Sequence, residues 1–138
     1  MKICGGGSVI ENIEVFTQNS IRVRGCAGTI YVDPFQMKEE PYDADFILIT
    51  HEHYDHFSRD DIAKVAGDHT VLVVPEKMRG KADEAADLVN AIRPEVAIPT
   101  HYGSIVGRPE DADVFSKMVD PLISFLYNSK CRRQISQT

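Results

Sequence analysis

The sequence of 138 residues contains no tryptophan and only three cysteines, which are Cys4, Cys26 and Cys131. They are widely separated and form no Cys-x-x-Cys pair, so neither a disulfide framework nor a thiolate zinc site is indicated and we expect reduced thiols. No apolar run approaches the roughly 18 residues that a membrane-spanning helix needs. The N-terminus also lacks the apolar segment of a signal peptide. We therefore expect a cytoplasmic protein with no membrane partner.

Positive charge is also scarce in this chain. There are 15 lysines and arginines against 21 acidic residues, which gives a net charge of -6 and a pI near 5.3. Nucleic-acid binding requires a clustered basic face, so nucleic acid is not an expected partner. The hydrophobic share of 43% and the charged share of 26% are typical of a soluble globular protein. A chain of this length builds one core, which predicts a single domain over residues 1–138.

The most informative stretch reads Thr-His-Glu-His-Tyr-Asp-His and follows an apolar run at 46–49 that predicts a buried strand. If the chain stays extended after that strand, His51 and His53 point the same way and can bind one ion together. A following turn into a helix makes Asp55 and His56 neighbours that point elsewhere, which suits a second ion. Imidazole and carboxylate ligands favour zinc, and manganese or iron are also compatible. The alternative interpretation is a solvated polar loop at the start of a helix.

Two further candidate residues follow predicted strands elsewhere in the chain. Asp33 ends an apolar strand at 29–32, where its carboxylate could orient a metal-bound histidine, although an aspartate before proline is equally typical of a turn. His101 follows a short apolar strand at 96–99. Sites in α/β sheets gather at the carboxyl ends of the strands, so we expect His101 to be a ligand of the same metal centre.

The remaining pattern predicts an antiparallel opening followed by alternating helices and strands. Alternating apolar residues around a polar turn predict a hairpin over 13–23, and Ser58 with Asp61 is a capping-box signature that begins a helix. The order strand, helix, strand then predicts parallel βαβ units. The later predicted elements are helices at 59–66, 83–92 and 109–119, strands at 71–74 and 96–99, and an apolar run at 122–127 typical of a strand. We expect a loose leader at 1–10, a core at 11–120 and a tail at 121–138 whose last ten residues are unstructured.

The histidine motif, with an aspartate ending an earlier strand and a histidine ending a later one, resembles the metallo-β-lactamase superfamily. The resemblance covers 11–120 and is closest to small metal-dependent hydrolases similar to L-ascorbate-6-phosphate lactonase. It implies an α+β fold, a shortened αββα sandwich with a mixed sheet flanked by helices, and hydrolysis by metal-bound hydroxide at one or two zinc ions. The resemblance implies that His51 and His53 bind the first metal and that Asp55, His56 and His101 bind the second. It also implies that Asp33 orients these ligands without binding a metal itself.

The chain departs from that family in its middle. Family members have a long segment between the strand at 71–74 and the next helix, which supplies further strands, another first-site ligand and the bridging aspartate. Here only 75–82 occupy the interval. Asp55, His56 and His101 still have the composition of a three-ligand catalytic zinc site, and Asp55 is also the candidate to handle the proton of the attacking water. Loss of the segment exposes apolar faces and a sheet edge, which predicts a homo-oligomer.

Three functional hypotheses follow from these patterns. The first is a metal-dependent hydrolase acting on a small lactone, ester or phosphorylated metabolite. The second is a non-catalytic metal-binding domain, a truncated relative without a complete dinuclear centre. The third is a structural remnant whose histidines bind nothing stably. The motif favours the hydrolase, with a small molecule as its substrate.

Overall fold

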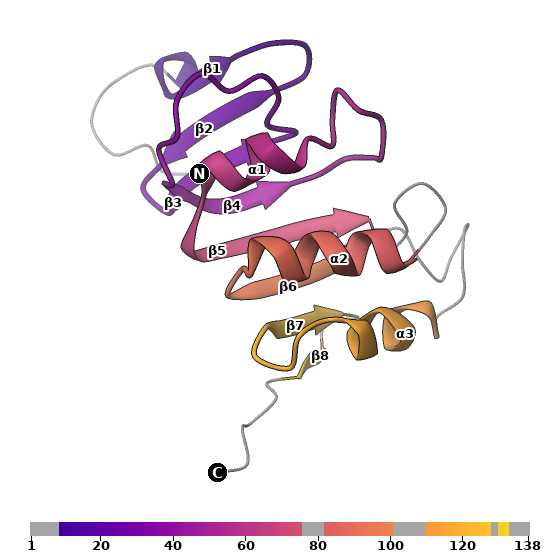
Figure 1. Cartoon of the computed structure of the whole chain (residues 1–138). Helices are drawn as coiled ribbons and strands as arrows, with labels where there is room; N and C mark the ends of the chain where they lie inside the picture. The colour runs from indigo at the N-terminus through magenta and orange to yellow at the C-terminus, as the bar shows by residue number, and fades with distance from the viewer. Residues whose placement is uncertain (1–8, 76–81, 101–109, 128–129, 133–138) are drawn as a thin grey trace.

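The computed structural model describes residues 9–75, 82–100, 110–127 and 130–132, which form one eight-stranded sheet with its strands in chain order. The three α-helices of this part of the chain lie on the same face of that sheet, as Figure 1 shows. The elements in order are η1 (Val9–Asn12), β1 (Ile13–Val15), β2 (Ile21–Gly25), β3 (Gly28–Val32), β4 (Ala44–Leu48), α1 (Arg59–Val65), β5 (Ala66–Pro75), α2 (Ala82–Ile92), β6 (Val96–Thr100), α3 (Asp111–Met118), β7 (Ser124–Tyr127) and β8 (Lys130–Arg132).

The first three strands form the predicted antiparallel meander. β1 pairs with β2, and β2 pairs with β3 around a tight turn in which Gly25 lies opposite Gly28. Gly28 has a φ of +130°, and a Cβ at this position would clash with the carboxylate of Asp45. That carboxylate approaches because it accepts a hydrogen bond of 2.7 Å from the backbone N–H of Thr29. The turn therefore requires glycine for both its conformation and its close contact.

From β3 to β7 the neighbouring strands run parallel, with α1, α2 and α3 as the crossovers after β4, β5 and β6. Right-handed crossovers between sequential neighbours place every helix on the same side, as Figure 1 shows. The carboxyl ends of β3, β4, β5 and β6 therefore meet at one edge of the sheet. This edge is where the candidate site lies.

The core lies between the sheet and the three helices. Fully buried side chains come from the strands and from the inner stripes of the helices, and the largest include Tyr31, Ile47, Leu72, Ile62, Val65, Leu88, Val89 and Phe115. The helices present these residues at the three- and four-residue spacing of a single apolar stripe. Their packing on one sheet face fixes where the loops that follow the strands begin.

Buried Asp61 connects α1 to the loop after β3. Its carboxylate accepts hydrogen bonds of 2.9 Å from the backbone N–H groups of Gln36 and Met37, and one of 2.6 Å from the hydroxyl of Ser58, the predicted helix cap. Lys64 lies 3.1 Å from the same carboxylate. Burial by itself would raise the pKa of Asp61, but these hydrogen bonds hold that pKa below its ordinary value. The ionised carboxylate thus anchors the loop that leads from Asp33 back to the sheet.

Several sequence predictions need correction. β5 begins at Ala66, five residues earlier than predicted, because buried Thr70 donates to the carbonyl of Ala44 and accepts from the N–H of Gly67, which pairs this polar stretch with β4. The last ten residues are not wholly unstructured, since β8 lies within them. Residues 9 and 10 of the predicted leader belong to the 3-10 helix η1.

The expectation of reduced thiols is wrong at Cys26, which is disulfide-bonded. Disulfides persist mainly in oxidising compartments, so the predicted cytoplasmic location loses the support that free thiols would have given. Within the described ranges, none of the helices has the length and apolar character needed to cross a membrane.

The fold class is confirmed in its coarser form, because a mixed sheet with three helices is an α+β architecture. The finer prediction was an αββα sandwich. The described residues provide one sheet and one layer of helices, and a second sheet and second helical layer are not among them.

Candidate metal centre

The predicted site residues lie where β3 and β4 end. Asp33 directly follows β3, and its backbone N–H donates to the carbonyl of Leu48 in β4 at 3.0 Å. The histidine motif begins three residues after β4. Its chain turns tightly, because the N–H groups of His56 and Phe57 both donate to the carbonyl of His53, at 2.9 and 2.8 Å. The strand pairing and this turn bring Asp33 and the motif together, although 17 residues lie between Asp33 and His51.

Asp33 is the centre of the hydrogen-bond network at this site. Its side chain is buried, with 1% of the residue exposed. One carboxylate oxygen accepts from the N–H of Thr50 at 2.7 Å, and the other accepts from the Thr50 hydroxyl at 2.6 Å and from Nδ1 of His56 at 2.7 Å. The backbone of Asp33 has a φ of +46°, a left-handed conformation that costs free energy in a residue other than glycine. The three hydrogen bonds and the strand pairing hold it there.

This network determines which ring nitrogens of two histidines carry protons. A carboxylate accepts hydrogen bonds but cannot donate them, so Nδ1 of His56 must be protonated. In the neutral ring its Nε2 therefore has the lone pair, which accepts from the side-chain amide of Asn19 at 3.2 Å. Thr50 gives its only hydroxyl proton to Asp33, so Nδ1 of His51, 2.9 Å from the hydroxyl oxygen, must donate to it. In the neutral ring of His51 the lone pair is therefore also on Nε2. The two rings lie against each other, with centroids 3.8 Å apart.

The possible metal donors form two close pairs. Nε2 of His51 lies 3.0 Å from Nδ1 of His53, and Nε2 of His56 lies 3.6 Å from a carboxylate oxygen of Asp55. Two nitrogens that each lie about 2.05 Å from a tetrahedral zinc ion are about 3.3 Å apart. Both separations are close to this value, so each pair fits one edge of the coordination sphere of an ion. At the first pair, Nδ1 of His53 donates to Nε2 of His51 and would lose that proton on binding a metal. These two pairs are the ones that the spacing of the motif predicts. The prediction that His56 points away from His51 is wrong, because both rings pack beside Thr50 with centroids 3.8 Å apart.

A complete ligand set is not present within the described residues. No three or more histidine, cysteine, aspartate or glutamate side chains among them are arranged as a group that could hold a metal ion. The predicted ligand His101 lies outside the described residues. The structure therefore brings together Asp33, His51, His53, Asp55 and His56, and the predicted ligand roles stay predictions.

Two residues of the site were not predicted from the sequence. Thr50 connects Asp33 to His51, and the side-chain amide of Asn19 donates to Nε2 of His56 at 3.2 Å. Asn19 belongs to the turn between β1 and β2, 37 positions from His56, and a polar residue in a hairpin turn gives no signal of such a contact. Thr50 had a usable signal, because it directly precedes the motif and carries a hydroxyl.

Aromatic side chains flank the motif on its exposed side. Tyr54 is 75% exposed and contacts the edge of the Phe35 ring, with centroids 6.0 Å apart. An exposed aromatic ring beside polar donors is a suitable contact surface for a small organic molecule.

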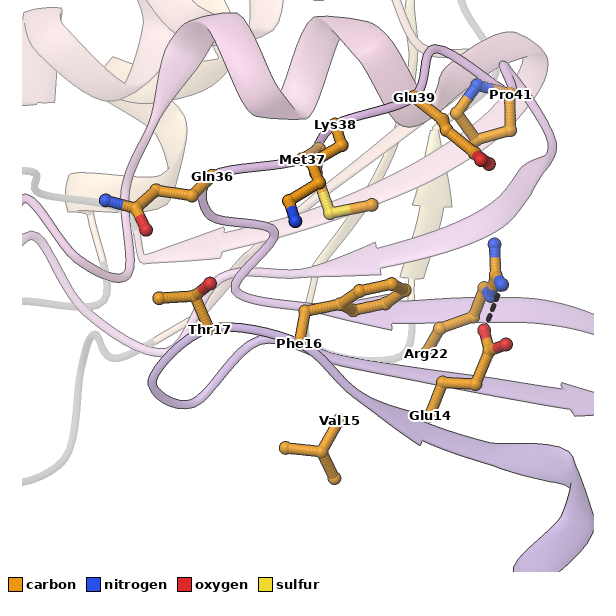
Figure 2. A pocket seen from close by; sticks show the side chains of 10 residues that line it. All are labelled: Glu14, Val15, Phe16, Thr17, Arg22, Gln36, Met37, Lys38, Glu39 and Pro41. Atoms are coloured by element: carbon orange, nitrogen blue, oxygen red, sulfur yellow. Dashed lines mark ion pairs between the residues drawn. The ribbon is translucent and has the colours of Figure 1, made fainter.

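A separate pocket of about 550 Å³ lies beside β1 and β2, and no residue of the histidine motif lines it. Figure 2 shows its side chains, including the ion pair between Arg22 and Glu14 and the ring of Phe16, which lies 5.3 Å from the Arg22 guanidinium. Arg22 also donates to the hydroxyl of Tyr31 at 3.1 Å. Glu14 neutralises the buried arginine, so this pocket has no free positive charge from Arg22 with which to bind an anion.

Comparison with protein-family models matches residues 12–80 to the beta-lactamase superfamily domain, and these residues include Asp33 and the whole histidine motif. Comparisons with curated proteins and with solved structures give no significant match. The matched segment spans half of the 138 residues. The superfamily resemblance predicted from the motif is thus confirmed, and this chain belongs to the beta-lactamase superfamily.

Proposed function

We propose that this protein is a metal-dependent hydrolase acting on a small lactone, ester or phosphorylated metabolite. The observation that carries the proposal is that Thr50 and Asp33 hold Nδ1 of His51 and His56 in hydrogen bonds, which leaves the lone pair of each neutral ring on Nε2. An unprotonated ring nitrogen with its other nitrogen hydrogen-bonded is the arrangement of a metal-ligating histidine. The narrower likeness to L-ascorbate-6-phosphate lactonase is part of this proposal. The cytoplasmic location stays a prediction, and the disulfide at Cys26 argues against it.

The donor pairs suit zinc, with manganese or iron as alternatives. When bound, such an ion supplies Lewis-acid polarisation of a carbonyl or phosphoryl oxygen and lowers the pKa of water. His51 and His53 would hold the first ion, and Asp55 and His56 the second, together with the predicted ligand His101.

The protein's own residues have distinct tasks in this proposal. Asp33 and Thr50 hold protons on Nδ1 of the two histidines and fix the ring planes, since each ring is hydrogen-bonded at Nδ1. Asp55 has one carboxylate oxygen beside His56 and a side chain that is 26% exposed, so its carboxylate is reachable by water and can accept a proton. Tyr54 offers an exposed ring to the organic part of a substrate.

A second candidate is a metal-binding domain without catalysis. It is favoured by the arrangement of the described donors, which form two pairs and no group of three. Two ligands alone make a weak site. The two candidates share the metal and differ in turnover.

Metal content combined with hydrolysis assays tests the proposal. Protein purified without chelators should contain about one or two zinc, manganese or iron ions per chain by elemental analysis, and it should hydrolyse members of a lactone, ester and phosphoester panel. His56→Ala should lose both metal and activity. His69→Ala is the matched control, because His69 is a highly exposed histidine on β5 that pairs only with Glu95 among the described contacts.

Each result has a definite meaning. Metal well below one ion per chain contradicts both candidates. Stoichiometric metal without hydrolysis supports the metal-binding domain, and an equal loss of activity in the two alanine variants contradicts the assigned role of His56.

A further inference from the structure

From β1 to β6 the sheet face opposite the helices carries an uninterrupted apolar surface, which ends at Ser124 of β7, the register partner of Val96. Strand register places twelve apolar residues on it in two rows, each crossing six strands from β1 to β6. We call this the open face. Its rows are Val15, Ile21, Val32, Leu48, Val73 and Ile98, and Ile13, Val23, Ile30, Phe46, Val71 and Val96.

The row between these two points to the other side of the sheet. It contains Tyr31, Ile47, Leu72 and Ala97, which are completely buried under the helices and the loop after β3. Alternation along each strand therefore assigns the twelve residues to the open face. A sheet covered on one side only would show polar residues on its other side, whereas no row member is polar or charged.

No described element buries the open face. None of its twelve residues belongs to the hydrophobic core or packs against it. Phe46 is 37% exposed, although it lies on the fourth of the six strands, and Ile13 and Val15 are 41% and 67% exposed. In Figure 1 the helices all lie on the opposite side of the sheet. Large apolar surfaces of this kind mark contacts with another molecule.

We propose that the open face packs against the same face of a second copy of this chain, which makes a two-sheet sandwich with helices on both outer sides. Six strands about 4.8 Å apart, with about five residues of each strand on the surface, give roughly 500 Å² of flat area per copy. Two such faces together bury about 1,000 Å², which is the lower limit for a specific interface and below the roughly 1,200–2,000 Å² of stable ones, so the expected dimer is weak, with a dissociation constant in the micromolar range.

The composition of the open face favours a second copy of this chain over another kind of partner. An aliphatic surface with one aromatic ring has no charge to attract a basic or acidic protein. In aligned sandwiches, two sheets with the same hand of twist pack face to face about 10 Å apart. A two-fold axis through the centre of the rows buries both copies of Phe46 with the same contacts.

The test uses the complete chain and two matched lysine substitutions. By sedimentation equilibrium, the unmodified protein should have twice the chain mass of 15.4 kDa. Phe46→Lys should weaken association by more than about a hundredfold, because each dimer loses two buried rings and gains two buried ammonium groups. Val114→Lys, at an exposed position of α3, should leave association unchanged.

Hydroxyl-radical labelling of the unmodified protein gives a second measurement that needs no folded variant. Labelling of Phe46 should fall several-fold as the protein concentration rises through the association range, while labelling of exposed Tyr54 stays constant. Three results overturn the proposal. They are a monomer at concentrations up to about 100 μM, where even a micromolar dimer forms, equal association of the two lysine variants, or Phe46 labelling that does not depend on concentration.

Discussion

Replacing Thr50 with valine tests whether one hydroxyl sets the protonation of two histidines. Valine has nearly the same shape, so the substitution leaves no cavity and removes only the hydroxyl. It deletes the 2.6 Å hydrogen bond to the Asp33 carboxylate and the acceptor for Nδ1 of His51. The backbone N–H of residue 50 still donates to Asp33, and His56 keeps its own bond to that carboxylate. His51 is therefore the histidine whose protonation should change.

The size of the effect follows from these lost bonds. A hydrogen bond to a charged group contributes about 1.5–3 kcal/mol, and the exposure of Thr50 places this one near the lower limit. We therefore expect Thr50→Val to be about 1.5 kcal/mol less stable than the unmodified protein. Loss of a group that orients a metal-ligating histidine weakens metal binding by about 10- to 100-fold. A free-energy loss of about 1.4 kcal/mol corresponds to tenfold, so tenfold weaker zinc binding is the expected result.

Two measurements check this expectation. Competition between the protein and a chelating dye gives the zinc affinity, and ¹⁵N NMR of the metal-free protein reports which ring nitrogen of each histidine is protonated. His51 and His56 should both be protonated at Nδ1, and His51 should become a mixture in Thr50→Val. Thr50→Ser keeps the hydroxyl and should behave as the unmodified protein does. Unchanged zinc affinity in Thr50→Val, or protonation at Nε2 in the unmodified protein, would refute the reasoning.

Three further substitutions test the fold by chemical denaturation. Asp61→Asn should lower the free energy of unfolding by about 2–3 kcal/mol, since one of two backbone donors loses its acceptor. Because the folded pKa of Asp61 is depressed, its contribution is complete above the ordinary aspartate pKa near 3.9 and is lost as the pH falls below that value, so the difference from Asp61→Asn should shrink there. Gly28→Ala should destabilise the protein by more than about 1 kcal/mol, through its positive φ and the contact with Asp45, and an unchanged midpoint would contradict this. Leu72→Ala should cost about 3 kcal/mol by leaving a cavity, whereas less than about 1 kcal/mol would show a loosely packed core.

The sequence was informative about the motif because its geometry is local. Spacing alone predicted that His51 would pair with His53 and Asp55 with His56, since residues this close in sequence have few ways to be arranged. The position of Asp33 beside the motif depends on β3 and β4 being parallel neighbours. The sequence predicted that both segments lie at strand ends, but it did not predict that these two strands are neighbours. The contact of Asn19 with His56 could not be predicted, because it depends on where an antiparallel hairpin ends relative to a distant loop.

The elements of the fold were predicted where apolar periodicity was strong. Alternation gave the hairpin of β1 and β2, and the stripes of α1 and α2 placed both helices within a residue at each end. The first half of β5 was missed because Gly67, Asp68 and His69 have low strand propensity, and pairing with β4 overrides it. β8 was missed because its basic, polar sequence is typical of an unstructured tail. It forms a strand by pairing with β7.

The order of strands in the sheet affects how the chain can fold. Every strand pairs with the strand that precedes it in the sequence, so each new pairing closes only the short loop or single helix between them. Such a sheet can grow by adding one strand at a time, starting from the hairpin of β1 and β2. The hairpin pairings are local, whereas the parallel pairings join residues 16 to 28 positions apart and should form more slowly. A ribosome-bound chain could therefore assemble this sheet strand by strand as it emerges.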